Sequence, residues 1–336
     1  MSVSNHAALA IREFWRWWLT ARARFEAAIG DGGWAGLPDE MNRRVASIAP
    51  ELEWEFCRGR QATHALVVSA AGSRQLRPLA ERWYRAAPVA DRTWEYHPAR
   101  QADPRAFAHR LGFGDRELDL ADLRFGYEPD DNRRQIDVSV YHPAFDQVAE
   151  RDRDHVAFLA LDWLLGEDAV EAWIGVIEAT TDGSDAGDAG DGLRAAVGAL
   201  ADEPPLWTVL RGVGLDGRPI TATVQTPLRA VRWPLFDQHI EVVLPYPPAD
   251  GRGLPGPSDL DALRAFEDRL VTRLDHTAAL IAHETSAGRR TLHVYADADT
   301  PATAVAGSLR GDWRYGPAQV AVRPDPAWEA VAHLRL

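Results

Sequence analysis

Apolar residues follow helical spacing near the start of the chain. Ile11, Phe14, Trp15 and Trp18 fall on the spacing of an amphipathic helix. Gly30 begins a glycine-rich stretch that is predicted to end this helix. The chain therefore opens with an unusually aromatic helix.

From residue 38 onward, helical and two-residue periods alternate in a recurring order. Residues 38–97 predict helix, strand, strand, helix, strand. The same order returns between 103 and 178, where 169–178 is expected to be the closing strand, and again between 258 and 323. A strand at 239–245 precedes the last unit and gives it the βαββαβ order of ferredoxin-like domains. We expect an α+β protein of repeated αββαβ units, ferredoxin-like modules with mainly antiparallel sheets.

A low-complexity stretch, DGSDAGDAGDG at residues 182–192, interrupts this pattern. Its glycines and aspartates offer nothing to bury, which is typical of a linker. We expect an N-terminal α+β domain at 1–181 with two αββαβ units after the tryptophan-rich helix. The linker at 182–192 then leads to a C-terminal ferredoxin-like domain at 193–336.

The net charge of −13 is distributed unevenly. Residues 1–100 have a net charge of +3, whereas residues 101–200 have a net charge of −13. An acidic surface of this kind repels nucleic-acid phosphates and suits a basic protein partner. A solvated face that keeps the protein soluble is the other interpretation. This charge disfavours nucleic acid as a ligand, except near the basic N-terminal helix.

Two residue types narrow the chemistry. The chain has no lysine, which excludes lysine Schiff bases, pyridoxal phosphate enzymes, P-loops and protein kinases. Arginine as the sole strong base, with abundant Ala, Gly and Pro, is typical of a GC-rich bacterial genome. Cys57 is the single cysteine, so an intrachain disulfide and a multi-cysteine zinc site are excluded. We expect Cys57 to act as a small apolar residue at a strand end, and we expect no cofactor.

The N-terminal segment does not have the pattern of a signal peptide. Arg12, Glu13 and Arg16 interrupt its apolar residues. No run of about 18 uncharged apolar residues predicts a membrane span. We therefore expect a cytoplasmic protein without a membrane segment.

The first helix is the strongest candidate for an interaction surface. Trp15, Trp17 and Trp18 crowd one helix and cannot all share a narrow stripe that faces the core. Core packing is one interpretation. The other is a surface in which these tryptophans, with Arg12 and Arg16, contact a partner, because Trp and Arg dominate interface energetics. We expect this basic helix to dock against the acidic middle third, within the chain or across a homodimer.

The predicted C-terminal hairpin carries a candidate polar cluster. The hairpin can bring His283 and His293 to face one another across two strands, and either Tyr295 or Glu284 can join them. Such a set suits metal binding or acid–base chemistry. Ordinary hydrogen-bonded strand histidines are the alternative, because zinc needs three or four converging ligands with supporting contacts. HExxH and GxSxG motifs are absent, so no catalytic or metal-ligating residue is assigned.

Two stretches of the chain resemble known families. The helix around Phe266, the hairpin 280–295 and the ending Asp325-Pro326-Ala327-Trp328 resemble a bacterial domain-of-unknown-function family. That family is similar to the RraB-type regulators of ribonuclease E activity, so the resemblance implies an acidic, ferredoxin-like regulator without enzymatic activity. The N-terminal part, with Phe14-Trp15-Arg16-Trp17-Trp18 and Trp54-Glu55-Phe56, resembles uncharacterised bacterial proteins.

These observations favour a non-enzymatic binding or regulatory protein that acts through protein–protein contacts and whose exact function is unknown. The alternative hypothesis is a hydrolase, or a protein that binds a small molecule or metal, with its site in a cleft between modules.

Overall fold

The computed structural model describes residues 3–113, 116–184, 187–214, 217–249 and 253–336. Residues 185 and 186 of the expected linker lie outside these ranges. The chain divides into two compact units, which are described separately: unit 1 is Met1–Glu203 and unit 2 is Pro204–Leu336.

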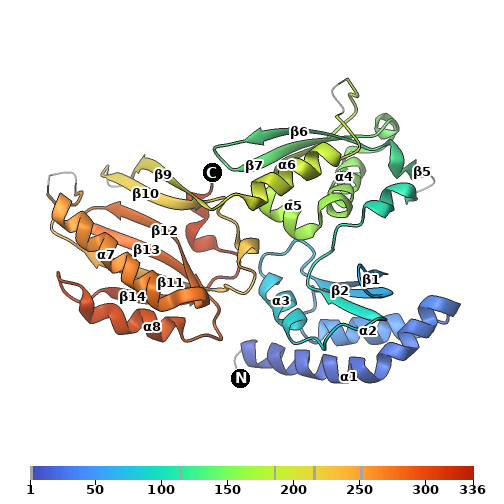
Figure 1. Cartoon of the computed structure of the whole chain (residues 1–336), viewed down its shortest axis with the longest axis horizontal. Helices are drawn as coiled ribbons and strands as arrows, with labels where there is room; N and C mark the ends of the chain where they lie inside the picture. The colour runs from blue at the N-terminus through green and yellow to red at the C-terminus, as the bar shows by residue number, and fades with distance from the viewer. Residues whose placement is uncertain (1–2, 114–115, 185–186, 215–216, 250–252) are drawn as a thin grey trace. The chain divides into compact units, whose positions relative to one another are not determined.

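The first half of unit 1 packs helices against a three-stranded sheet (Figure 1). The sheet order is β1-β2-β3, with β1 antiparallel and β3 parallel to β2. Phe14, Trp18 and Phe25 of α1 are buried against Trp83 of α3 and Trp94 of β3, so the aromatic spacing of the first helix builds the core. The elements are α1 (Val3–Asp31), α2 (Leu37–Ala46), β1 (Glu53–Arg58), β2 (His64–Ser69), α3 (Arg77–Arg85) and β3 (Trp94–His97).

The second half of unit 1 repeats this plan around the sheet β6-β7-β8. β6 and β7 are antiparallel and β8 is parallel to β7. The residues predicted as strand at 169–178 begin in helix α5 and become strand only from Ile174, because a short apolar run fits a buried helix as well as a strand. The elements are η1 (Pro104–Ala108), β4 (Arg110–Phe113), β5 (Arg116–Asp119), η2 (Leu120–Asp122), β6 (Arg124–Asp130), β7 (Gln135–Tyr141), η3 (Phe145–Gln147), α4 (Glu150–Leu165), α5 (Glu167–Trp173), β8 (Ile174–Thr180) and α6 (Asp191–Asp202).

The segment that follows β8 is part of unit 1. The backbone N–H of Phe125 donates to the carbonyl of Asp188 at 2.8 Å, and Leu193 of α6 is buried in the same core as β6 and β7. The structure divides the chain into its two compact units after Glu203, beyond the linker expected at 182–192. A backbone hydrogen bond to β6 and the burial of Leu193 hold this segment, and its composition gives no sign of either.

Unit 2 contains one six-stranded sheet of order β14-β11-β13-β12-β10-β9, in which every neighbouring pair is antiparallel. Helices α7 and α8 cover one face (Figure 1), where Phe266 and Leu270 pack on Ile240, Leu292 and other sheet residues. The elements are β9 (Leu206–Val213), β10 (Pro219–Thr226), η4 (Ala230–Arg232), β11 (Gln238–Pro245), α7 (Pro257–Leu274), η5 (Asp275–Thr277), β12 (Ala278–Ser286), β13 (Arg289–Ala296), α8 (Ala302–Ser308), η6 (Leu309–Asp312), β14 (Gln319–Pro324) and η7 (Glu329–Leu334).

The α+β class with mainly antiparallel sheets is confirmed. Three ferredoxin-like repeats are not. The two principal sheets of unit 1 have three strands each, whereas β11 to β14 form four strands in βαββαβ order within a larger sheet. Within the described ranges, no helix is long and apolar enough to cross a membrane.

Candidate functional site

A chain of hydrogen-bonded polar side chains lies on the face of the unit 2 sheet opposite α7 and α8. Nε2 of His239 is 3.1 Å from Nδ1 of His293. Nε2 of His293 is 3.0 Å from Oε1 of Glu284, and Nε2 of His333 is 3.0 Å from the same oxygen. We call these four residues, His239, His293, Glu284 and His333, the histidine chain.

The histidine chain runs from the core to the surface. His239 is 1% exposed and His293 is 4% exposed, whereas the side chain of His333 is 56% exposed. The histidine chain therefore connects the fully buried imidazole of His239 to the imidazole of His333, which is in contact with water.

A β-bulge in strand β12 decides which residues join this chain. The register between β12 and β13 shifts between Leu280 and Ala282, so that Ala282 pairs with His293. Because paired residues share a face and side chains alternate along a strand, the extra residue turns Glu284 toward His293. A regular strand would have put His283 on that face instead.

His283 consequently leaves the cluster that the sequence predicted. Its Nδ1 lies 3.3 Å from Oε2 of Glu267 on α7, and Arg290 donates to the other oxygen of this carboxylate at 2.8 Å. The expected pairing of His283 with His293 is therefore wrong, whereas Glu284 and His293 do meet. The physical reason is the bulge, which has no clear sequence signal.

Tyr295 belongs to a second contact on the same face. Its hydroxyl donates to Oδ2 of Asp325 at 2.5 Å, and its ring stacks on Trp328 with centroids 4.2 Å apart. Trp328 has a φ of 58°, a left-handed conformation that bulky residues rarely adopt. Its Nε1 donates to the carbonyl of Phe236 at 2.8 Å. These contacts fasten the C-terminal segment onto the sheet.

Burial and charge set the protonation of these groups. Burial, with the neighbouring His293 and Arg323, lowers the pKa of His239 to about 4. The hydrogen bond from His293 lowers the pKa of the Glu284 carboxyl. Burial and the adjacent Asp325 raise the pKa of Tyr295. Near neutral pH, His239 is therefore neutral and Glu284 is ionised.

The histidine chain can pass a proton between buried and exposed positions, because each imidazole has both a donor and an acceptor nitrogen. A metal ion has no prepared place there. Among the described residues, no group of three or more His, Cys, Asp or Glu side chains is arranged to hold one.

The tryptophans expected to form an interaction surface lie mostly in the core. Trp18 is fully buried and Trp15 is 5% exposed; the indole N–H of Trp15 donates to the carbonyl of Trp83 at 2.8 Å. Trp17 is half-buried, and its N–H donates to Glu40 at 2.7 Å. Arg12 and Arg16 are exposed. The interaction-surface prediction therefore fails for Trp15 and Trp18, because α2, α3 and the sheet cover them.

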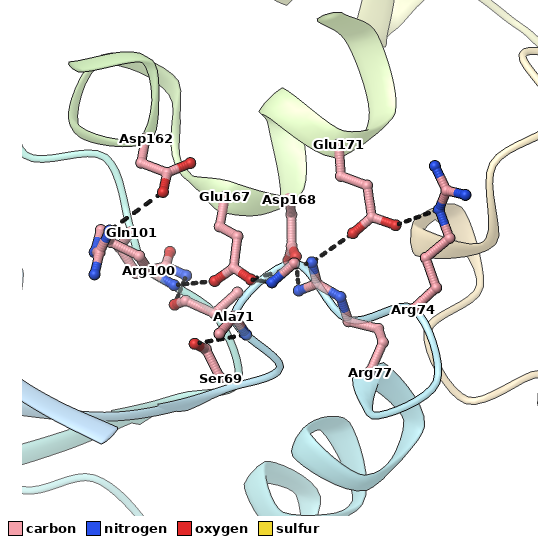
Figure 2. Close-up of polar contacts among 12 residues, drawn as sticks. Ser69, Ala71, Arg74, Arg77, Arg100, Gln101, Asp162, Glu167, Asp168 and Glu171 are labelled. Atoms are coloured by element: carbon pink, nitrogen blue, oxygen red, sulfur yellow. Dashed lines mark hydrogen bonds and ion pairs between the residues drawn. The ribbon is translucent and has the colours of Figure 1, made fainter. Parts of the chain in front are cut away.

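The acidic middle third docks on arginines outside the first helix. Figure 2 shows Arg77, at the start of α3, surrounded by carboxylates of α5. Arg77 is 3% exposed; it contacts Asp168, lies 3.5 Å from Glu167 and donates to Glu171 at 2.6 Å. Burial raises the pKa of the Asp168 carboxyl despite the adjacent Arg77. Within the described residues these three acids therefore pair with Arg77 of α3, and docking of the first helix on the acidic middle third stays a prediction.

Arg100 makes a second ionic junction in the same half-buried region (Figure 2). It binds both oxygens of Glu55, at 2.9 and 2.8 Å, and lies 3.2 Å from Asp162. Burial, with Glu167 and Glu55 nearby, raises the pKa of Asp162 to about 6 although Arg100 opposes the shift. Arg77 and Arg100 together join the two halves of unit 1.

Strand β9 forms an exposed apolar edge of the unit 2 sheet. It is the terminal strand next to β10, and its Leu206, Trp207, Val209 and Val213 are 44%, 41%, 54% and 73% exposed. Arg211 is the single charged residue of this strand. We call these four apolar residues the β9 edge. The sequence alone gives no sign that β9 lies at the sheet edge, or that His239, His333 and Asp325 join the polar contacts of unit 2.

Comparison with known proteins finds one family model that matches unit 2. Residues 206–333 match DUF695, a family of unknown function. The DUF695 match spans β9 to η7 and contains both the histidine chain and the β9 edge. It confirms the expected likeness of the C-terminal part to a family of unknown function, and it assigns no activity.

No curated protein matches the chain. A crystal structure of a protein from Thermus thermophilus is similar at 11% identity and a TM-score of 0.19. The similarity covers 87% of this chain and 38% of the other, so this chain spans well under half of that protein. A likeness this weak carries no argument about fold or function.

Proposed function

We propose that this chain is a non-enzymatic binding protein that acts through contacts with another protein, and that the β9 edge is its contact surface. The observation that carries the proposal is the exposure of four large apolar side chains on one edge strand. Unpaired strand edges are templates for an added strand, and natural proteins usually protect them with charges or proline.

The two edges of the unit 2 sheet differ in this protection. β14 ends with Arg323 and Pro324, which are residues that discourage strand addition. β9 has the sequence LWTVLRGV with a single charge. The asymmetry supports a binding role for β9.

The occupant that fits is an extended segment of a partner protein. Backbone pairing along β9 would supply affinity, and the alternating Trp207, Val209 and Val213 would contact apolar side chains of the added strand. Arg211 lies among them and favours a segment that also carries an acidic residue.

Affinity capture with the full chain tests this proposal. We expect Val209→Glu together with Val213→Glu to lose a captured partner, because charges are placed where apolar contacts form. Val271→Glu, on α7 of the same unit and 47% exposed, is the matched control and should retain the partner.

Two outcomes would contradict the proposal. In one, the β9 variant and the Val271→Glu control capture the same proteins. In the other, the wild type sediments as a dimer that Val209→Glu converts to a monomer, which would make a second copy of this chain the occupant.

A finer form of the proposal concerns the identity of the partner. The resemblance of the C-terminal part to RraB-type regulators makes ribonuclease E the first partner to test. We expect the wild type to inhibit cleavage of a single-stranded RNA by ribonuclease E, and the β9 variant not to. Absence of inhibition would overturn the proposal that ribonuclease E is the partner. The capture experiment tests the binding role of the β9 edge separately.

A further inference from the structure

Two cavities in unit 1 share a wall. The smaller has a volume of about 230 Å³ and the larger a volume of about 840 Å³. Arg60, Glu95 and His97 line both. Their volumes lie in and just below the range of small-molecule sites.

The carboxylates of the smaller cavity are already occupied. Glu55 binds Arg100 through both oxygens. Asp103 pairs with Arg105 at 2.6 Å. The third carboxylate, Glu95, accepts backbone hydrogen bonds from the loop that follows β1.

Two arginines of this cavity make no ion pair among the described residues, although the charge of Arg58 helps to lower the pKa of the Asp103 carboxyl. Arg58 and Arg60 are both exposed, and no carboxylate of the described residues lies within 4.0 Å of either guanidinium group. The side chain of Arg60 donates only to the carbonyl of Ala102, at 3.3 Å. Arg92, on the wall of the larger cavity, is likewise without an ion pair in the described chain.

The loop that carries Arg60 is held in a fixed conformation. The Glu95 carboxylate accepts the backbone N–H groups of Arg60, Gln61 and Ala62 at 2.8, 2.8 and 2.9 Å. A Cβ on Gly59 would lie 2.5 Å from the carbonyl oxygen of Ala62, so this position requires glycine. A rigid loop presents its arginines at little entropic cost on binding.

The Cys57 thiol, which also lines the smaller cavity, adds no negative charge. Burial and the nearby Glu55 raise the pKa of the Cys57 thiol to about 11, so the thiol stays neutral near neutral pH. The net charge of +3 on residues 1–100 further distinguishes this region from a chain of net charge −13.

We propose that the smaller cavity binds an anionic small molecule through Arg58 and Arg60, with the rest of the molecule in the larger cavity beside Arg92. A phosphate or carboxylate group supplies the shared chemistry, since guanidinium groups bind both through paired hydrogen bonds. This site is independent of the β9 edge.

Isothermal titration calorimetry of the full chain with pyrophosphate and with citrate tests the proposal, and glycerol serves as the uncharged control ligand. We expect at least one anion to bind below about 1 mM at low salt. Arg58→Gln and Arg60→Gln should each weaken binding by about tenfold, because each removes a charge-assisted hydrogen bond. Pyrophosphate alone would identify a phosphate site, and citrate alone a carboxylate site.

Arg12→Gln is the matched control, since Arg12 is exposed and lines neither cavity. It should bind as the wild type does, and thermal unfolding should confirm that all three variants fold. Absence of binding up to about 10 mM, or an equal loss in Arg12→Gln, would overturn the proposal.

Discussion

At the scale of single residues, the pKa of His239 lies well below that of an ordinary histidine. His239 is fully buried, and its hydrogen-bond partner is another histidine. Protonation of His239 would place a charge in the core beside His293 and Arg323, and burial with these two neighbours outweighs the opposing effect of Asp325. His239 and His293 were visible in predicted strands of the sequence, but their burial depends on how the chain packs over this face of the sheet.

This burial predicts a pH dependence of stability. The pKa of His239 is about 4 in the folded protein and about 6.5 in an unfolded chain. Between these values the unfolded state binds more protons. The free energy of unfolding should therefore fall as the pH drops from about 6.5 to about 4, by up to about 3 kcal/mol. Urea unfolding of unit 2 at pH 7 and pH 4.5 measures the change.

Substitution separates His239 from the other titrating groups. His239→Gln should flatten the dependence in that window, whereas His276→Gln, at a side chain that is 86% exposed, should leave it unchanged. An equal pH dependence in the wild type and His239→Gln would show that His239 is not responsible.

At the scale of elements, the sequence predicts the order of helices and strands better than it predicts which side chains contact one another. Helix, strand, strand, helix, strand is the observed order of residues 38–97, because each element has its own apolar period. The bulge at Leu280 and Ala282 was not predictable, and it exchanged Glu284 for His283 beside His293. A one-residue shift reverses every side chain that follows it.

The junction between α3 and α5 shows the same limit. Charge counts indicated that an acidic segment docks on arginines, but they did not identify Arg77, whose position depends on the three-dimensional packing. Arg77→Met should destabilise unit 1 by about 3–5 kcal/mol, because it leaves the carboxylates of α5 unpaired in a half-buried place. Denaturant unfolding measures the loss.

Arg74 provides the control for this junction. It is 39% exposed and lies 3.8 Å from Glu171, so Arg74→Met should cost less than about 1 kcal/mol. Similar losses in the two variants would contradict a special role for Arg77.

At the scale of the whole molecule, the two units carry different candidate sites. Unit 1 has two cores joined by ion pairs and contains the arginine-lined cavities. Unit 2 matches DUF695 and has the exposed β9 edge. The linker-like composition of 182–192 suggested an earlier boundary, yet the hydrogen bond between Phe125 and Asp188 ties that segment to strand β6 of unit 1.

Amide hydrogen exchange of the full chain, with and without the captured partner, tests the central claim most directly. A partner strand that pairs with β9 should slow exchange at Leu206–Val213 by about tenfold or more, because it satisfies the outward backbone groups of that strand. Exchange at β14, the opposite edge, should not change. Protection confined to β14, to the first helix or to the cavities of unit 1, with β9 unchanged, would contradict the account.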